Sequence, residues 1–214
     1  MNEKFQNRYR IESNRWQFWN YSAPGSYFIT ICIEGRDEIL GKVINAKMQL
    51  SEFGQIAASE FLNIPKYHKR VKSDRWVVMP NHVHCIITLG DWDYDNGMVG
   101  IVGQIHEFDL QYPSRHPYQS QPPHHDENNP PTITDIKQYR ALRRQMIIPK
   151  ILGKYQMLTS KQMNIRRNTP GRKNWQHDYY DHVIRNHEEY ARIDQYIINN
   201  PRKWDEDRFN TTIV

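Results

Sequence analysis

Residues 79–89 read MPNHVHCIITL, a short turn followed by a run in which polar and apolar residues alternate. Successive side chains of a β-strand point to opposite faces of the sheet, so His82 and His84 share one face. The residues of the other face are all apolar: Val83, Cys85, Ile87 and Leu89. The pattern predicts a strand over 82–89 with one buried face and with two adjacent imidazoles on the other face.

Segments on both sides of this strand predict an antiparallel sheet with helices. Residues 26–34 (SYFITICIE) alternate in the same way and are rich in β-branched residues, which favours a second strand. The expected elements in chain order are a strand at 26–34, a hairpin at 41–50 that turns at Asn45–Ala46, a helix at 51–67 with Ser51 as N-cap, strands at 75–79 and 82–89, a helix at 147–165, a strand at 175–185 and a helix from Asn186 that ends before Pro201. This order is typical of an α+β, ferredoxin-like fold, a single antiparallel sheet with helices packed on one face.

The composition bounds the domain organisation and the class of protein. The chain has 214 residues, enough for one domain with an insertion, and 38% of them are apolar. No run approaches the ~20 apolar residues of a membrane span, and no secretory signal is present, so we expect an intracellular protein. Two cysteines cannot form a disulfide framework or a four-ligand zinc site. Residues 91–131 contain six prolines and little periodicity, which predicts an inserted, partly disordered loop.

Positive charge is concentrated in one part of the chain. Residues 136–173 contain eleven Lys or Arg and no Asp or Glu, although the net charge of the whole chain is only +5. Such a run is typical of a surface that binds a polyanion, because phosphates neutralise the repulsion and release their counterions. A solvated basic helix face is the other interpretation. The predicted phosphate contacts are Arg143, Arg144, Lys154, Arg166 and Arg167.

Two groups of residues could carry chemistry. The imidazoles of His82 and His84 suit two ligands of one divalent metal, and a third ligand must then complete the site; two outward polar positions on a half-exposed strand are the alternative. In the last helix, Tyr196 and Asn200 are four residues apart and lie one above the other. From the spacing alone, a tyrosine at the edge of the core and a polar helix end are the preferred interpretation. A tyrosine beside a phosphate that a metal polarises can also act as a nucleophile.

Taken together, these residues resemble a known family. The segment 80–84 (PNHVH) resembles the HUH motif, His–bulky apolar–His, of single-strand endonucleases. With Trp175–Gln176, with 179–186 (YYDHVIRN) and with 196–201 (YIINNP), the chain resembles the REP-associated tyrosine transposases, relatives of the single-tyrosine insertion-sequence transposases. The resemblance covers roughly Ser26 to Trp204. It departs from the family pattern mainly in the insertion at 91–131.

The resemblance implies a specific activity in one HUH transposase-like domain over 1–214. An RRM-like sheet would carry His82 and His84, which with Asn200 would bind Mg²⁺ or Mn²⁺, and the C-terminal helix would carry the catalytic Tyr196. Members of the family cut and rejoin single-stranded DNA near hairpins, through a 5′-phosphotyrosine link that releases a 3′-hydroxyl. The expected partner is therefore single-stranded or hairpin DNA, in the cytoplasm and at the nucleoid. The ligand chemistry of imidazole favours Mn²⁺ or another transition ion, and the resemblance is the reason to keep Mg²⁺ as a candidate. A monomer and a homodimer with shared active sites both fit the sequence.

Two other functions agree with the same residues. A binding module without catalysis could keep the RRM-like sheet and hold a hairpin of DNA or RNA. A hydrolytic metallonuclease could use the same histidines with water in place of Tyr196. If the nucleophile is a different tyrosine, the candidates are Tyr179, Tyr180 and Tyr190.

Overall fold

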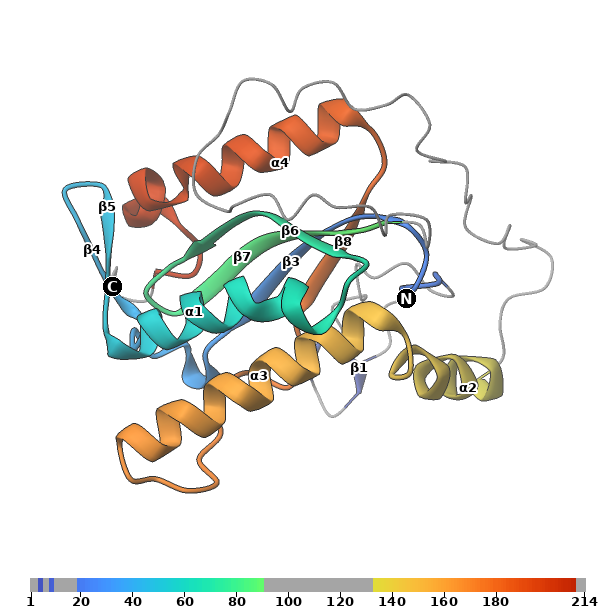
Figure 1. The fold of residues 1–214 in the computed structure, drawn as a ribbon, viewed down its shortest axis with the longest axis horizontal. Helices are drawn as coiled ribbons and strands as arrows, with labels where there is room; N and C mark the ends of the chain where they lie inside the picture. The colour runs from blue at the N-terminus through green and yellow to red at the C-terminus, as the bar shows by residue number, and fades with distance from the viewer. Residues whose placement is uncertain (1–3, 6–7, 10–18, 91–132, 211–214) are drawn as a thin grey trace.

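A four-stranded antiparallel sheet forms the centre of the computed structural model, which describes residues 4–5, 8–9, 19–90 and 133–210 (Figure 1). Its strands are β3 (Gly25–Cys32), β6 (Val71–Val78), β7 (His82–Leu89) and β8 (Tyr180–Ile184), in the order β6-β7-β3-β8. Each neighbouring pair is antiparallel. The two strands joined by the hairpin turn, β6 and β7, lie side by side as predicted, and the order confirms the ferredoxin-like α+β fold. The insertion expected at 91–131 lies outside the described residues.

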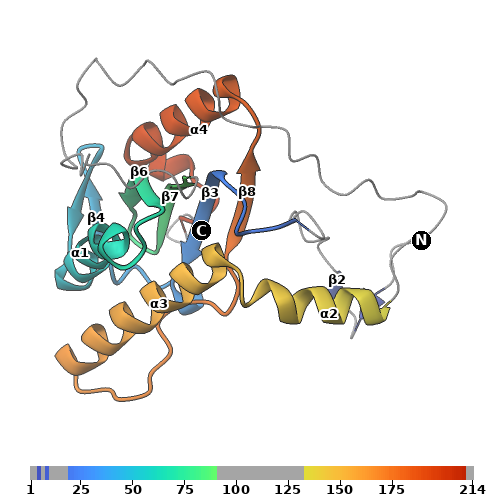
Figure 2. The ribbon, with the colours of Figure 1, turned by 45° about the vertical axis from the view of Figure 1, so that its right-hand side comes forward.

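Helices lie on both faces of this sheet. Helices α1 (Glu52–Tyr67) and α3 (Ile147–Arg166) pack on one face, as predicted (Figure 1). Helix α4 (His187–Asn199), which carries Tyr196, packs on the opposite face, so the helices do not all lie on one face as expected (Figure 2). The imidazole face of β7 therefore faces α4, and the apolar face of β7 faces α1 and α3.

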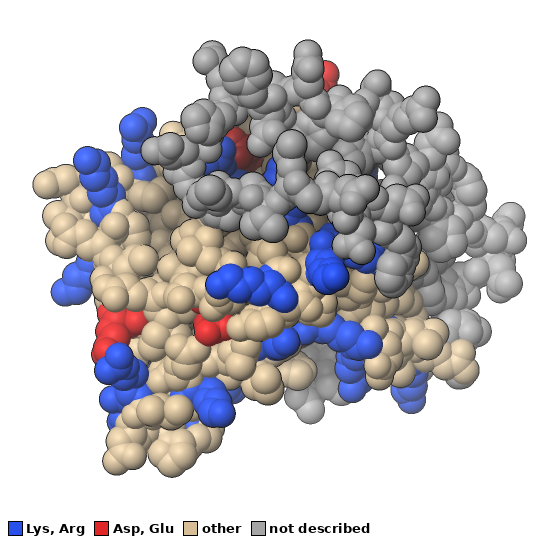
Figure 3. All heavy atoms as spheres, viewed as in Figure 1, with Lys and Arg blue, Asp and Glu red and all other residues tan. Residues whose placement is uncertain are grey.

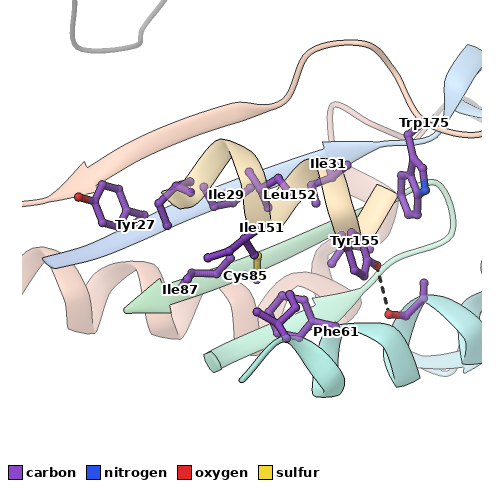
Figure 4. Packing of buried hydrophobic residues seen from close by; sticks show 14 of the residues in the cluster. Tyr27, Ile29, Ile31, Phe61, Cys85, Ile87, Ile151, Leu152, Tyr155 and Trp175 are labelled. Carbon is purple, nitrogen blue, oxygen red and sulfur yellow. Dashed lines mark hydrogen bonds between the residues drawn. The ribbon is translucent and has the colours of Figure 1, made fainter. Parts of the chain in front are cut away.

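The main hydrophobic core fills the space between the sheet, α1 and α3 (Figure 4). The alternation of β3 and β7 explains it, because every second side chain of each strand points into this layer. Phe61 of α1 and Tyr155 of α3 cover these side chains, and the Tyr155 hydroxyl donates to the carbonyl of Ala57 at 3.2 Å. The strand residues in this layer are Tyr27, Ile29, Ile31, Val83, Cys85, Ile87 and Leu89. Each large apolar side chain buried here contributes about 1.5–3 kcal/mol.

A separate hairpin precedes α1. Strands β4 (Gly41–Ile44) and β5 (Lys47–Leu50) pair with each other in a sheet of their own. They turn at the predicted dipeptide, where Asn45 and Ala46 have φ angles of 50° and 59°. Two successive positive φ angles are typical of the tight turns that match strand twist. Ser51 then caps α1 by accepting from the backbone N–H of Gly54 at 3.1 Å, as predicted.

The starts of two strands differ from those expected, and one helix was not expected. Strand β8 begins at Tyr180 rather than at 175, because Trp175 makes an isolated bridge to Ile33 and its indole donates to Thr159 in the core. Strand β6 begins at Val71, and its pairing with β7 is irregular between Ser73 and Trp76. A helix that the sequence did not indicate, α2 (Ile133–Arg143), precedes α3.

The remaining elements are short. They are β1 (Lys4–Phe5) and β2 (Arg8–Tyr9), which pair with each other, and the 3-10 helices η1 (Glu34–Arg36) and η2 (Asn200–Glu206). Within the described ranges, no helix combines the length and the apolar character needed to cross a membrane.

Candidate active site

The two histidines of β7 form the centre of the site. His82 and His84 are fully buried, and their Nε2 atoms lie 3.0 Å apart. The register of β3 against β7 places Thr30 opposite His84, and the Thr30 hydroxyl lies 2.8 Å from His84 Nδ1. The predicted common face of the two imidazoles is therefore present, and it lies under α4 rather than toward solvent.

Asn81 determines the tautomer of His82. Its side-chain amide donates two hydrogen bonds, to the carbonyls of Phe209 at 2.7 Å and of Arg36 at 3.1 Å. These two bonds fix the orientation of the amide, so that its oxygen, Oδ1, faces His82 Nδ1 at 2.9 Å. An amide oxygen can only accept a hydrogen bond. His82 Nδ1 must carry the proton, and His82 Nε2 consequently presents a lone pair to His84.

Both imidazoles are held in the neutral form. Burial, followed by the nearby guanidinium groups of Arg208 and Arg36, lowers the pKa of His82 to about 3. Burial also lowers the pKa of His84 well below its usual value, followed by the effect of His82 and Arg208. Neutral imidazoles are the form that binds a metal, so the pair is prepared for ligation across the physiological pH range.

Helix α4 brings Tyr196 to this pair. Ile193 and Ile197 form an apolar stripe on α4 that is buried against Ile86 and Ile184 of the sheet. Tyr196 lies beside that stripe, half-exposed, with its hydroxyl 3.1 Å from His84 Nε2. Burial raises the pKa of Tyr196, the Asp207 carboxylate raises it further, and Arg208 and a side-chain hydrogen bond from Asn200 lower it. The tyrosine is therefore protonated in this state and can donate to His84.

Asp207 and Asn200 complete the arrangement. Asn200 caps α4, is 2% exposed, and donates to Asp207 Oδ2 at 3.3 Å. The Oδ1 atom of Asn200 is buried without a hydrogen-bond partner. The other Asp207 oxygen accepts from the backbone N–H of Phe209 at 2.8 Å. Ligand atoms of His82, His84 and Asp207 all lie within 4.8 Å of one another.

These groups fit a divalent cation. Two facing imidazole nitrogens and a carboxylate present lone pairs within 4.8 Å of one another, and a cation would satisfy all three. Asn200, whose amide nitrogen donates to that carboxylate, keeps a buried oxygen without a partner. The predicted residues His82, His84 and Asn200 are brought together here. Sequence reasoning missed Asp207, which follows α4 in an acid-rich segment (204–208, WDEDR) that gave no periodic signal. Two imidazoles and a carboxylate favour Mn²⁺ over Mg²⁺.

The other tyrosines named as candidates have different surroundings. The Tyr179 hydroxyl accepts from Arg143 at 3.3 Å, and Tyr179 packs on the α1 and α3 side of the sheet. Tyr180 contacts the ring of Phe28, with the ring centroids 6.1 Å apart. Tyr190 packs against the α4 cluster. Among these four candidates, Tyr196 is the one whose hydroxyl lies within hydrogen-bond distance of the histidine pair.

The five predicted phosphate contacts lie away from this pair. They belong to α2, α3 and the residues that follow them, and Lys and Arg gather over this part of the surface (Figure 3). Because α3 packs on the far side of the sheet, none of these side chains is brought to the imidazoles. Nucleic acid that contacted both regions would have to pass around an edge of the sheet.

Several of these five side chains already have partners within the protein. Arg143 lies 3.9 Å from the Asp181 carboxylate and over the ring of Tyr21. Arg166 pairs with Glu52 at 3.1 Å at the surface. The other contacts are Lys154 with the Tyr67 ring, and Arg167 with Asn164, Thr169, Asn174 and the Phe53 ring. Arg144 is exposed. Their role as phosphate contacts stays a prediction.

Comparisons with known proteins give three similarities. An uncharacterized protein of Haemophilus influenzae is 28% identical over 196 residues, which is 92% of this chain and 91% of that protein. The structure is similar to a REP-associated tyrosine transposase bound to a REP hairpin, with a TM-score of 0.45, 18% identity, and coverage of 91% of this chain and 74% of the other. It is also similar to a transposase candidate from Deinococcus radiodurans, with a TM-score of 0.40, 12% identity, and coverage of 88% and 97%. No protein-family model matches the chain.

The two similar structures are of the kind that the sequence motifs resemble. Their TM-scores and identities are too low to carry a function over to this chain. The chemistry has to be inferred from the arrangement of Tyr196, the two histidines and Asp207.

Proposed function

We propose that this chain is a metal-dependent enzyme that cuts and rejoins single-stranded DNA through Tyr196. One observation carries the proposal: the Tyr196 hydroxyl lies 3.1 Å from His84 Nε2, within a group of atoms that can hold a divalent cation. Phosphodiester transfer requires both a cation near the non-bridging oxygens and a nucleophile beside it. The preference for hairpins such as REP sequences comes from the sequence resemblance alone.

The residues of the chain have distinct roles in this reaction. His82, His84 and Asp207, with Asn200, would hold Mn²⁺ or Mg²⁺, which supplies Lewis-acid activation of the phosphate when bound. Tyr196 Oη attacks phosphorus, the P–O3′ bond breaks, and a 5′-phosphotyrosine and a 3′-hydroxyl result. Water reaches the half-exposed tyrosine and takes the phenol proton, and the leaving oxygen takes a proton in return. The energy of the bond is retained, so the same hydroxyl can reverse the step.

Partners and place of action follow from this activity. Single-stranded and hairpin DNA are the proposed substrates, with the cytoplasm and nucleoid as the location. Tyr196 reaches the histidine pair of its own chain, so a monomer is sufficient for the reaction. A homodimer is equally compatible with the proposal.

A covalent adduct tests the proposal directly. Purified protein with Mn²⁺ and an end-labelled single-stranded hairpin oligonucleotide should give a protein–DNA band on a denaturing gel. Tyr196→Phe should abolish the band, and His82→Ala should lose both the band and Mn²⁺ binding. Tyr180→Phe is the matched control, because its ring lies on the same face of the sheet but packs against Phe28. Adduct formation that survived both Tyr196→Phe and His82→Ala would refute the site assignment.

The same gel separates the two alternatives. A hydrolytic metallonuclease would cut the oligonucleotide in Tyr196→Phe and leave no DNA on the protein. A binding module without catalysis would shift the hairpin on a native gel and leave it intact with every metal. The approach of the Tyr196 hydroxyl to a candidate metal ligand favours the covalent route over both.

A further inference from the structure

Two arginines stand beside the histidine pair on a shared aromatic ring. Phe209 is buried, and its ring centroid lies 4.5 Å from that of His82. The guanidinium carbons of Arg36 and Arg208 lie 5.1 Å and 4.8 Å from the centroid of the same ring. Arg36 also donates to the backbone carbonyl of Arg208 at 3.4 Å. The chain thus places two fixed positive charges at the edge of the candidate metal site.

These two charges lack acidic partners among the described residues. Throughout the described part of the chain, no carboxylate lies within ion-pair distance of either guanidinium, whereas Arg75, Arg166 and Arg192 each pair with an acid. The neighbouring Asp207 accepts hydrogen bonds from Asn200 and from the backbone of Phe209 and forms no ion pair with either of these two guanidinium groups. Two adjacent cations without an anion repel each other, and the arrangement becomes favourable when an anion binds between or beside them.

We propose that Arg36 and Arg208 form a phosphodiester-binding site that holds single-stranded nucleic acid against the His82–His84 pair. The inference rests on the proposed function, because it names the groups that place the backbone near Tyr196. A guanidinium offers a planar set of donors that suits phosphate, and stacking on Phe209 fixes the planes of both groups in advance. The basic helix α3, on the far face of the sheet, cannot fill this role.

The site also couples DNA binding to metal binding. Both guanidinium groups lie on the ring of Phe209, whose centroid is 4.5 Å from that of His82, so in the absence of DNA their positive charge opposes a bound cation. A bound phosphodiester neutralises them and removes that opposition. Binding of DNA should therefore tighten Mn²⁺ binding, and by reciprocity Mn²⁺ should tighten DNA binding by the same factor.

The test uses full-length protein that carries Tyr196→Phe, so that cleavage does not interfere. Anisotropy of a fluorescein-labelled single-stranded oligonucleotide should show about tenfold weaker binding for Arg36→Gln and for Arg208→Gln. The slope of log affinity against log salt should fall by about 0.7 for each lost contact. Arg36→Lys, which keeps the charge, should retain most of the affinity. Arg192→Gln, an exposed arginine of α4 that pairs with Glu189, should change neither quantity.

Mn²⁺ binding without DNA provides the deciding second measurement. Electron paramagnetic resonance of free Mn²⁺ should show that Arg36→Gln and Arg208→Gln bind the metal as well as the parent protein or more tightly, because a repulsive charge is gone. A purely structural role at Phe209 predicts the opposite, a joint loss of metal and DNA binding, and that result would overturn the proposal. So would unchanged DNA affinity in both variants. Failure of the adduct assay in the wild-type protein would refute the proposed function without affecting this comparison, which involves no cleavage.

Discussion

The hydroxyl of Tyr196 lies 3.1 Å from Nε2 of His84, although the two residues are 112 positions apart in the chain. Two features produce this approach. Strand β7 directs its even-numbered side chains toward α4, and the buried stripe of Ile193 and Ile197 fixes the rotation of α4 about its axis. The nucleophile and the candidate metal ligands therefore belong to two rigid elements on one face of the sheet.

The charge of Asp207 should control the acidity of Tyr196. Without metal, burial and the Asp207 carboxylate both raise the Tyr196 pKa above its ordinary value, so Asp207→Asn should lower it. Arg208→Gln should raise it, because the guanidinium favours the phenolate. Carbon NMR of ring-labelled tyrosine, with the signal assigned from Tyr196→Phe, measures both shifts in chelator-treated protein. Shifts in the same direction for the two variants would contradict this assignment of charges.

An ion pair should hold α4 in the orientation that the site requires. Arg75 of β6 and Asp194 of α4 form two contacts, at 2.5 Å and 3.4 Å, with both side chains less than a third exposed. A double-mutant cycle in urea with Arg75→Ala and Asp194→Ala should give a coupling of about 1 kcal/mol. Each single variant should also lower the adduct yield, because Tyr196 lies only two residues after Asp194.

The pair formed by Arg166 and Glu52 is the matched control for that cycle. Both of its side chains are more than half exposed, so its coupling should be close to zero. Equal coupling in the two cycles would mean that the position of α4 does not depend on the pair formed by Arg75 and Asp194.

Local patterns were enough to predict most of the fold. A few neighbouring residues determine each of three features: the alternation in β3 and β7, the turn at Asn45–Ala46 and the cap at Ser51. The boundaries of β8 were wrong because Trp175 is buried through a single bridge and a hydrogen bond to Thr159, neither of which has a periodic signature.

The site was predictable where a strand pattern or a family motif marked it. The common face of His82 and His84 follows from strand periodicity, whereas the choice of Tyr196 and Asn200 came from the family resemblance. Asp207 could not be distinguished from its acidic neighbours in the sequence, because its position depends on contacts with residues far away in the chain. Trp204 and Phe209 bury themselves against Cys32 and Met79, and only that tertiary contact brings the carboxylate to the histidines.

Asn81 should act on the metal through His82. Asn81→Ala removes the acceptor for His82 Nδ1–H and leaves the carbonyls of Arg36 and Phe209 without their donor. Unpaired buried groups cost about 1–3 kcal/mol, so the free energy of unfolding should fall by a similar amount. Mn²⁺ affinity should fall about 10- to 100-fold, as for other residues that orient a ligand.

Asn63→Ala provides the comparison for Asn81→Ala, because Asn63 accepts a hydrogen bond only from the exposed Lys66 of the same helix. It should change neither stability nor Mn²⁺ affinity measurably. Titration of Mn²⁺ into both variants, with urea unfolding alongside, separates the loss of ligand orientation from a general loss of stability. Normal Mn²⁺ affinity in Asn81→Ala would show that the tautomer of His82 does not depend on this amide.

The buried histidine pair should make the metal-free protein sensitive to acid. Burial holds the pKa of His82 at about 3 and lowers that of His84, whereas both titrate near 6.5 when the chain unfolds. Below pH 6.5 the unfolded state therefore binds more protons than the folded state, and stability falls as the pH falls. Each histidine contributes a slope of about 1.4 kcal/mol per pH unit in the free energy of unfolding. The contribution of His82 is present above 6.5 and is lost progressively toward its folded pKa.

Urea unfolding between pH 6 and pH 4.5 in the presence of a chelator measures this slope. His82→Gln should reduce it by about 1.4 kcal/mol per pH unit. The variant lacks the imidazole that binds a proton in the unfolded state but not in the folded state. Mn²⁺ should stabilise the wild-type protein and not His82→Gln, since metal that binds only the folded state adds its binding free energy to stability. Identical slopes in wild type and His82→Gln would mean that His82 is not held in the neutral form by its burial between β7 and Phe209.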